Sequence, residues 1–218
     1  MRICVVGNGQ SPVGHGDFID CHDRVIRVNG WWLTHPPPVA GRKCTHWSWN
    51  TALYLVGLKE RGEKNNPVRR KIPRNPDGSK AVLCAENFRG RGKHKMNAQI
   101  AAAALGKPKI RYMDKNADSR LQKRLREYAG RKLMPSTGIR AIHRAILMKP
   151  HHLTIIGFDA TTPDKPGWDD KGNPWRKNWN CHGFVAEKYI IRDLADNQDW
   201  LGQPVDITVD WVGRPDDI

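Results

Sequence analysis

Residues 2–29 read RICVVGNGQSPVGHGDFIDCHDRVIRVN, and the rest of the fold can be worked out from this stretch. It holds two apolar runs, Ile3–Val6 and Val25–Val28, whose length and β-branched content are typical of buried strands. An asparagine stands at the carboxyl end of each run, Asn8 after the first and Asn29 after the second. Because open α/β sheets bind ligands beyond the carboxyl ends of their strands, the stretch predicts a ligand site beside these asparagines.

The loop between the two runs is rich in glycine and holds Gly7, Gly9, Gly14 and Gly16, with Ser11 among them. Glycine lets a backbone turn tightly and approach a phosphate closely, so a nucleotide site is one interpretation. The spacing is neither GxGxxG nor that of a P-loop, because no Gly-Lys-Ser/Thr follows. Taken by itself, the loop is equally compatible with a simple turn.

Strand-like and helix-like segments alternate along the rest of the chain. Further strands are expected at 45–50, 81–85, 110–113, 153–158 and 205–212, the last at an edge. Helices are expected at 17–20, 98–105, 118–129, 138–148 and 183–195. This order predicts an α/β fold with a mostly parallel central sheet and helices on both faces. With 218 residues, 39% of them hydrophobic, the chain fits a single domain over 1–218 that carries a basic, loop-rich insert at 59–95.

Positive charge is concentrated in that insert. The formal net charge is +15, and between Lys59 and Lys95 twelve Lys or Arg accompany four acidic residues. Such a patch favours a polyanion. The side chains expected to contact an anionic acceptor are Arg69, Arg70, Arg89, Arg91 and Lys93. A solvated loop with no specific partner is the alternative interpretation.

Three blocks of the sequence resemble, in the same order, the long, short and very short sialylmotifs of the sialyltransferases that use CMP-sialic acid, glycosyltransferase family 29. The long motif is matched by VVGN at 5–8, IDCHDRVIRVN at 19–29 and GRKCTH at 41–46. The short motif is matched by PSTGIRAIHRAILMKPHHLTIIGFD at 135–159, and the very short His-x4-Glu motif by 182–187. Three motifs in the family's order, spanning most of the chain, are a specific signal.

The resemblance implies the single-domain, Rossmann-like GT-A variant of this family and an inverting glycosyltransferase. Such an enzyme moves a sialic-acid-like sugar from a CMP-activated donor to an acceptor hydroxyl in one in-line displacement. A CMP-sugar has one phosphate, so backbone N–H groups at a helix N-terminus can neutralise the leaving group without a metal ion. We therefore expect no cofactor and no metal, a nucleotide-sugar donor and a glycan acceptor.

The resemblance also implies roles for individual residues. The 136–138 turn would hold the donor phosphate and the carboxylate of its sugar, and the two asparagines would hold the nucleotide. The full set of implied donor and nucleotide contacts is Gly7, Asn8, Ser11, Asn29, Ser136, Thr137 and Gly138. Two simpler roles stay open, because Ser136 is also a good helix N-cap and Asn29 is also a common turn residue.

The attacking hydroxyl must lose its proton, and histidine is suited to accept a proton near neutral pH. His182 stands at the family's catalytic position, just ahead of the helix expected at 183–195, and Glu187 would orient this segment. His22 is a weaker candidate for which a structural role is open. Three further histidines are expected at the surface. His143 lies in the helix expected at 138–148, and His151 and His152 follow that helix.

The chain departs from the family's pattern between the second and third blocks. The family usually has a His or Tyr there that touches the donor phosphate, whereas residues 175–180 read WRKNWN. Arg176 or Lys177 could make this contact, or the donor could differ. The metal-binding carboxylates of other GT-A enzymes are not evident, because the aspartate pairs at 169–170 and 216–217 lie in expected loops.

The cysteines and the apolar runs indicate in which cellular compartment the protein is expected. Five cysteines form no CxxC pair, so a zinc site is not expected. The family's disulfide has no counterpart, since Ile3 stands at its first position and residues 149–150 at its second, which fits a reducing compartment. No signal-peptide pattern opens the chain and no apolar run reaches bilayer-spanning length. We expect a cytoplasmic protein, of a bacterial or virus-infected cell, without stable membrane insertion.

Two other functions are open at this level. A phage-type glycosyltransferase could use a nucleotide sugar to modify a hydroxylated base in DNA, with the basic segment binding phosphates and nine tryptophans offering stacking surfaces. A nucleic-acid-binding protein could keep the fold and lose catalysis. The presence of Ser136, His182 and Glu187 argues against this last interpretation.

Overall fold

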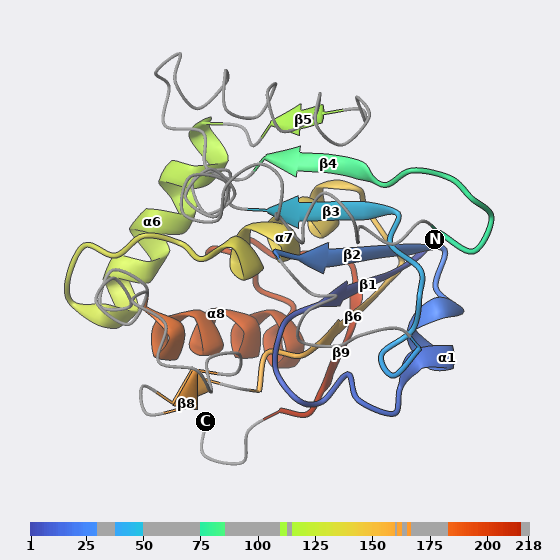
Figure 1. Ribbon diagram of the computed structural model, residues 1–218. Coiled ribbons are helices and arrows are strands. Elements are labelled where there is room, and N and C mark those ends of the chain that lie inside the picture. Colours follow the sequence, from blue (N-terminus) through green and yellow to red (C-terminus); the bar gives the residue numbers. More distant parts are fainter. Residues whose placement is uncertain are drawn as a thin grey trace, which may run out of the picture.

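The computed structural model describes residues 1–29, 38–49, 75–85, 110–112, 115–159, 161–162, 165–166 and 183–214 (Figure 1). Within these ranges seven strands form one sheet in which every neighbouring pair is parallel. The strands are β1 (Arg2–Val6), β2 (Arg24–Val28), β3 (His46–Trp49), β4 (Val82–Ala85), β5 (Ile110–Tyr112), β6 (His152–Ile156) and β9 (Thr208–Val212). The α/β fold with a parallel central sheet, expected from the sequence, is confirmed.

The helices of the described part are α1 (Gly16–Asp20), α6 (Lys115–Ala129), α7 (Thr137–Leu147) and α8 (Phe184–Asn197). α7 begins where the sequence predicts, because Ser136 has the extended backbone of an N-cap (φ −68°, ψ 167°) and its Oγ accepts a hydrogen bond from the Ile139 N–H. A separate antiparallel pair is formed by β7 (Thr161–Thr162) and β8 (Lys165–Pro166).

The central strands are buried on both faces. β1 pairs with β2 on one side and β6 on the other, so that Cys4 lies opposite both Val25 and Thr154. A parallel strand covered on both faces needs a continuous apolar run, and residues 3–6 supply one. β9 pairs with β6 and forms one edge of the sheet, as predicted, with its residues half-buried or exposed.

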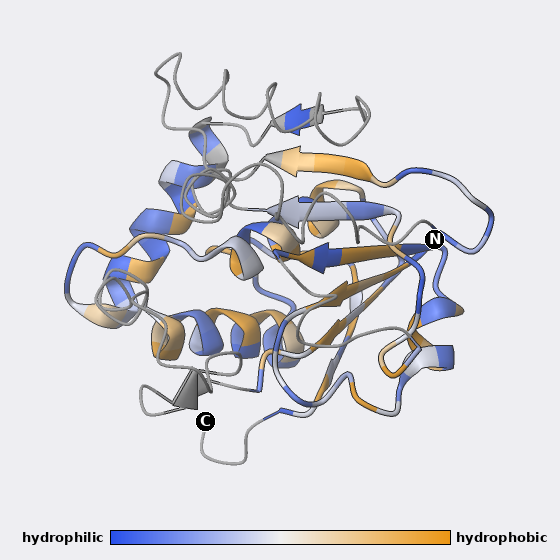
Figure 2. Cartoon of the chain, in the orientation of Figure 1, coloured by the Kyte–Doolittle hydropathy of each residue, from blue (hydrophilic) through white to orange (hydrophobic). Residues whose placement is uncertain are grey.

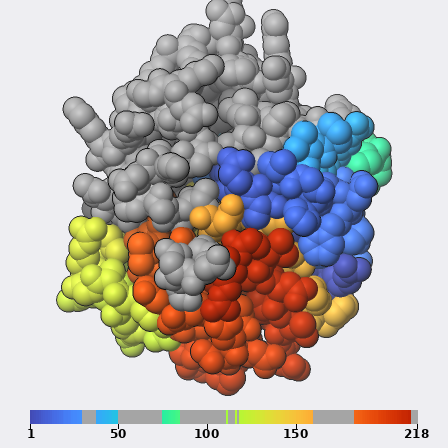
Figure 3. All heavy atoms as spheres, turned by 90° about the horizontal axis from the view of Figure 1, so that it is seen from below, coloured from blue at the N-terminus to red at the C-terminus, as the bar shows by residue number. Residues whose placement is uncertain are grey.

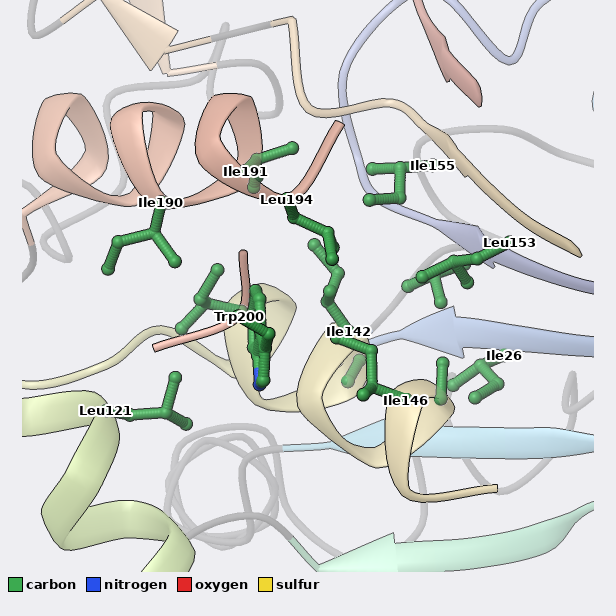
Figure 4. Packing of buried hydrophobic residues seen from close by; sticks show 14 of the residues in the cluster. Ile26, Leu121, Ile142, Ile146, Leu153, Ile155, Ile190, Ile191, Leu194 and Trp200 are labelled. Atoms are coloured by element: carbon green, nitrogen blue, oxygen red, sulfur yellow. The ribbon is translucent and has the colours of Figure 1, made fainter. Parts of the chain in front are cut away.

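The larger core lies between one face of the sheet and helices α6, α7 and α8 (Figures 1 and 4). α7 is central to it, because Ile142 is fully buried and Ile146 lies one turn further along the same face. Figure 4 shows these side chains meeting Leu194 of α8 and Ile26 of β2 in one apolar layer. Hydrophobic colouring follows the central strands in Figure 2, and hydrophilic colouring covers most of α6.

The opposite face of the sheet carries α1 and the segment at 38–45. Ile19 of α1 joins Cys4 and Val25 in a smaller core. Arg27 of β2 is fully buried and donates to the carbonyl oxygens of Lys43 at 2.8 Å and Ala40 at 2.7 Å. A buried guanidinium needs such acceptors, so Arg27 fastens this segment to the sheet.

The order of the strands determines where a ligand can bind. The order is β5-β4-β3-β2-β1-β6-β9, so the chain first extends the sheet on one side of β1 and then continues on the other side with β6. The topology therefore reverses between β1 and β6. In open parallel sheets the loops that diverge at such a point leave a ligand-binding crevice. The loops concerned here are 7–15, after β1, and 157–159, after β6.

The end of β9 also reaches this place. A Cβ placed on Gly213 would lie 2.4 Å from the Cβ of Ser11, so the two loops are in contact. Figure 3 shows the C-terminal segment, in red, beside the N-terminal segment, in blue, on this face of the molecule.

Some expected elements lie outside the described residues, namely the helix at 98–105, most of the insert at 59–95 and most of the loop at 161–180. Among the described helices, none combines the length and apolarity that crossing a membrane requires. Cys4, Cys44 and Cys84 are buried and Cys21 is exposed, and these four are free thiols.

Candidate functional site

The loops after β1 and β6 are in backbone contact at the switch point. The Gly7 N–H donates to the Ile156 carbonyl at 2.8 Å, and the Gly9 N–H to the Gly157 carbonyl at 2.9 Å. A Cβ on Gly7 would lie only 2.2 Å from the Gly157 oxygen, and Gly157 itself has a φ of +82°. Both glycines are therefore required by the packing of the chain on itself, whereas the sequence suggested a phosphate contact or a simple turn as the reason for Gly7.

Ser11 and Asp159 fasten the same two loops. The carboxylate of Asp159 accepts from the Gln10 N–H at 2.9 Å, the Ser11 N–H at 3.0 Å and the Ser11 hydroxyl at 2.9 Å. The Ser11 Oγ in turn accepts from the Gly157 N–H at 2.8 Å. The nucleotide contact predicted for Ser11 stays a prediction, while its hydroxyl has a structural role in the loop.

Asn8 and Asn29 lie at the carboxyl ends of neighbouring strands, as predicted. The Oδ1 atom of Asn8 is buried and finds no hydrogen-bond partner within the described ranges. Asn29 has a left-handed backbone (φ 49°), its N–H donates to the Ser48 carbonyl at 2.7 Å and its carbonyl accepts from Trp47 Nε1 at 2.6 Å. The backbone of Asn29 therefore has the conformation of a turn residue. Asn8 presents an acceptor that a ligand N–H or O–H could satisfy.

The ring of Phe158 brings together the first two sequence blocks. A Cβ on Gly7 would lie 3.1 Å from Phe158 Cδ2, and a Cβ on Gly138 would lie 2.8 Å from Cε1. Both glycines therefore lie against one ring, and the loop after β1 meets the N-terminus of α7 there. Sequence reasoning assigned no role to Phe158, although its place directly after the strand and Gly157 was a usable signal.

The first turn of α7 has backbone N–H groups that can donate hydrogen bonds to a ligand. The Ile139 N–H is taken by the Oγ of Ser136 at 3.3 Å. No acceptor in the described part of the chain takes the N–H groups of Thr137 and Gly138. Free N–H groups at a helix N-terminus carry partial positive charge and favour an anion. The N-cap role of Ser136 is confirmed, and the phosphate role stays a prediction.

Glu187 lies beneath this turn. Its side chain is 5% exposed, and its two oxygens accept from the Ser136 N–H and the Ser136 hydroxyl, each at 2.6 Å. Burial raises the pKa of Glu187 to about 7, against the opposing effects of the Ser136 hydrogen bonds and the charge of Arg140. Glu187 therefore orients the Ser136 turn through direct contact, whereas the sequence suggested that it would orient the segment that holds His182.

Several predicted site residues lie outside the described residues. These are His182, Arg176, Lys177, Arg69, Arg70, Arg89, Arg91 and Lys93. Gly183, which follows His182 in the chain, is described. A Cβ on Gly183 would lie 2.3 Å from Cδ1 of Leu133, so the start of α8 packs against the segment that leads to Ser136.

The surface position predicted for His143 is wrong. His143 is 2% exposed, its Nδ1 accepts from Nε1 of Trp200 at 2.7 Å, and the two rings stack. The reason is helical spacing, because residue 143 is four positions after Ile139 and so shares its buried face. His151 is exposed, and His152 is half-buried and pairs with Asp210 at 2.9 Å.

His22 is held on both sides of its ring. Its Nδ1 bonds to the Phe18 carbonyl at 2.9 Å and its Nε2 to Thr154 Oγ1 at 2.9 Å. It is fully buried, and burial lowers its pKa. This surrounding fits the structural role left open for His22. A search of the described residues finds no group of three or more His, Cys, Asp or Glu side chains arranged to hold a metal ion.

No protein-family model matches the chain, and no curated protein matches it in sequence. Solved sialyltransferase structures match it in fold. CstII from Campylobacter jejuni, in complex with the substrate analogue CMP-3FNeuAc, superposes with a TM-score of 0.55 at 13% identity, over 99% of this chain and 82% of that one. The monofunctional α-2,3-sialyltransferase Cst-I from the same organism gives 0.56 at 13%, over 99% and 76%.

A mammalian sialyltransferase superposes with a TM-score of 0.58 at 17% identity, over 96% of this chain and 68% of that one. At such identities the likeness establishes the fold. The chain therefore has the α/β fold that these sialyltransferases share.

Proposed function

We propose that this chain is an inverting glycosyltransferase that moves a sialic-acid-like sugar from a CMP-activated donor to the hydroxyl of a glycan acceptor. The observation that carries the proposal is the meeting of Gly7, which precedes Asn8, with Gly138 at the N-terminus of α7, across the ring of Phe158. Two separate blocks expected to hold the donor thus lie at one switch point. Fold neighbours include a sialyltransferase complex with CMP and a trisaccharide acceptor, and the GT-A-type variant is part of the proposal.

In this proposal the donor phosphate lies at the first turn of α7. The N–H groups of Thr137 and Gly138 are the donors, and the partial charge of the helix N-terminus stabilises the negative charge that the leaving CMP acquires. The buried Oδ1 of Asn8 accepts a hydrogen bond from the nucleoside. Arg176 or Lys177 adds a further charge to the phosphate. With these hydrogen-bond donors and this positive charge, the phosphate needs no metal ion.

The transfer is a single displacement. The acceptor oxygen forms a bond to the anomeric carbon while the bond from that carbon to the CMP phosphate breaks, so the configuration inverts. His182 accepts the proton of the attacking hydroxyl, as a histidine can near neutral pH. Glu187 keeps the Ser136 turn in place through its two hydrogen bonds.

The DNA-directed alternative relies on the basic segment at 59–95 and on the tryptophans as stacking surfaces. The contact residues proposed for it lie outside the described part of the structure. Two sialyltransferase neighbours are described as complexes with a trisaccharide acceptor and with Gal-beta-1-3GalNAc-ortho-nitrophenol, both glycans.

Calorimetric binding of CMP, compared with UMP, UDP and GDP, tests the donor. We expect a preference for CMP that magnesium or manganese does not change. The variant Asn8→Ala should weaken CMP binding by roughly tenfold, because it removes one buried acceptor. A preference for a uracil nucleotide, or a strict metal requirement, would contradict the proposal.

Substitution of the proposed base separates chemistry from binding. His182→Ala should abolish sugar transfer and leave the dissociation constant of CMP nearly unchanged, whereas the matched variant at an exposed histidine, His151→Ala, should keep full activity. An active His182→Ala enzyme would show that another group accepts the proton.

A further inference from the structure

The Oγ atom of Ser136 both donates and accepts a hydrogen bond. Ser136 Oγ accepts from the Ile139 N–H at 3.3 Å, and its own proton is donated to Glu187 Oε2 at 2.6 Å. The other carboxylate oxygen accepts the Ser136 N–H at 2.6 Å. An ionised carboxylate can only accept, so the single hydroxyl proton of Ser136 is fully used by Glu187.

A proton on Glu187 reverses this arrangement. A protonated Oε2 donates to Ser136 Oγ, whose two lone pairs then accept from Glu187 and from the Ile139 N–H. The Ser136 hydroxyl proton is then left without an acceptor among the described residues. It can then bond to a group beside the free N–H groups of Thr137 and Gly138. The backbone bond from the Ser136 N–H to Oε1 is the same in both states.

We propose that Glu187 is a proton-linked positioning residue, whose protonated carboxyl releases the Ser136 hydroxyl to bind an anionic group at the N-terminus of α7. Where Glu187 is ionised in the free site, anion binding is therefore accompanied by the uptake of one proton from solvent, which stays on Glu187 Oε2. The inference rests on the proposed function for the identity of the ligand, a nucleotide phosphate, and on the geometry for the coupling.

Burial and a nearby charge act on Glu187 in opposite directions. The charge of Arg140, on α7, lowers the pKa of Glu187, and Arg140 is itself ion-paired with Asp118 of α6 at 2.7 Å. On its own helix the neighbouring Lys188 is also buried. Burial holds the pKa of Glu187 at about 7, so the free site has both protonation states near neutral pH. A bound anion repels the carboxylate and raises this pKa further.

The linkage predicts a particular pH profile for CMP binding. Above the pKa of Glu187, each pH unit should weaken binding by up to about tenfold, the limit for one coupled proton. Glu187→Gln has the same hydrogen-bond pattern as the protonated acid, because its amide N–H donates to Ser136 Oγ and its carbonyl accepts the Ser136 N–H. We expect this variant to bind CMP as tightly as the wild type does at pH 6, and about tenfold more tightly than the wild type at pH 8.

The experiment measures CMP binding by calorimetry between pH 5.5 and 8.5, in two buffers of different ionisation enthalpy, with the wild type, Glu187→Gln and the exposed matched control Glu127→Gln. The phosphate of CMP titrates near pH 6, so the quantity compared is the difference between proteins. At pH 8, wild type and Glu127→Gln should take up close to one additional proton relative to Glu187→Gln, and at pH 5.5 close to none. If Glu187→Gln weakens binding by the same factor at every pH, the residue has a merely structural role and the inference is overturned.

A second measurement separates this inference from the proposed function. The Glu187 carboxyl is titrated by ¹³C NMR in the free protein, and again with CMP or with sulfate, which carries a constant charge over this range. A carboxyl that titrates near pH 7, and higher with sulfate, supports the linkage even if CMP does not bind, and in that case the donor assignment alone fails. Titration below pH 5, or a midpoint that saturating anion leaves unmoved, overturns the linkage. Absence of binding by both anions at every pH overturns it as well.

Discussion

At the scale of single residues, Glu187 has an unusual environment for a carboxyl group. It is buried, and within the described residues its carboxyl forms no ion pair, since both oxygens accept only from Ser136. A carboxylate removed from water without a cation is destabilised, and the free energy is lowered when the group takes up a proton. Two short hydrogen bonds offset part of that penalty, which leaves the pKa raised to about 7.

This raised pKa predicts how stability changes with pH. The pKa of Glu187 is about 7 in the folded protein and near 4.5 in the unfolded chain, so the folded protein binds the proton more tightly. The stabilisation is complete below pH 4.5 and is lost as the pH rises to about 7. The loss is on the order of 3 kcal/mol.

Urea unfolding at several pH values measures this effect. The free energy of unfolding of the wild type should fall relative to Glu187→Gln between pH 4.5 and 7, and the difference should be constant above pH 8. Parallel curves for the two proteins throughout this range would show that Glu187 has an ordinary pKa.

At the scale of elements, the site depends on how two loops from opposite sides of the switch point are fastened. Asp159, after β6, accepts three hydrogen bonds from residues of the loop after β1. The backbone of the same loops is in contact at Gly7 and Gly157, where no side chain would fit. Because Asn8 lies between Gly7 and the Asp159 contacts, the position of its backbone is determined by this connection.

Removal of the Asp159 hydrogen bonds should affect ligand binding more than the stability of the fold. Asp159→Ala leaves the Ser11 N–H and hydroxyl without their acceptor and should reduce the free energy of unfolding by about 1–3 kcal/mol. We also expect weaker CMP binding, since Asn8 is no longer held. The control is Asp206→Ala, an exposed aspartate, which should change neither quantity. Unaltered CMP affinity in Asp159→Ala would mean that the loop is positioned by its glycine contacts alone.

At the scale of the whole molecule, the sheet topology and the net charge act together on an anionic ligand. All seven strands of the central sheet are parallel, so their carboxyl ends lie at one edge, and the helix N-termini of α7 and α8 meet near that edge through Ser136 and Glu187. The chain carries a formal net charge of +15. A net positive charge attracts anions over a distance and raises the rate at which they reach the site.

The association rate of CMP should therefore depend on salt. Raising the ionic strength from about 0.05 to about 0.5 M shortens the Debye length several-fold and should slow CMP association by about tenfold, with little change in dissociation. Stopped-flow measurements with cytidine, which has no phosphate, provide the control and should show little salt dependence. Equal salt dependence for both ligands would rule out long-range attraction of the phosphate.

The sequence by itself was sufficient for the seven strands of the central sheet, for the four described helices and for their order, but not for the β7–β8 pair. The apolar runs at 3–6 and 25–28, and the Ser136 N-cap before α7, are local patterns, and local patterns persist in any compact arrangement of the chain. Their alternation also determined the parallel sheet, and the position of both asparagines at carboxyl ends follows from strand direction alone. Glycine spacing was less informative, since Gly7 is required by a backbone contact that no local pattern contains.

Only the tertiary structure decided which of these residues meet. Ser11 and Asp159 are separated by 148 positions in the sequence, and Ser136 and Glu187 by 51. Such contacts depend on strand order, on register and on the angle at which helices pack, and none of these is a property of a short segment. Burial, too, is a property of the packed molecule, and for this reason the raised pKa of Glu187 and the buried position of His143 became visible only when the sheet and helices were assembled.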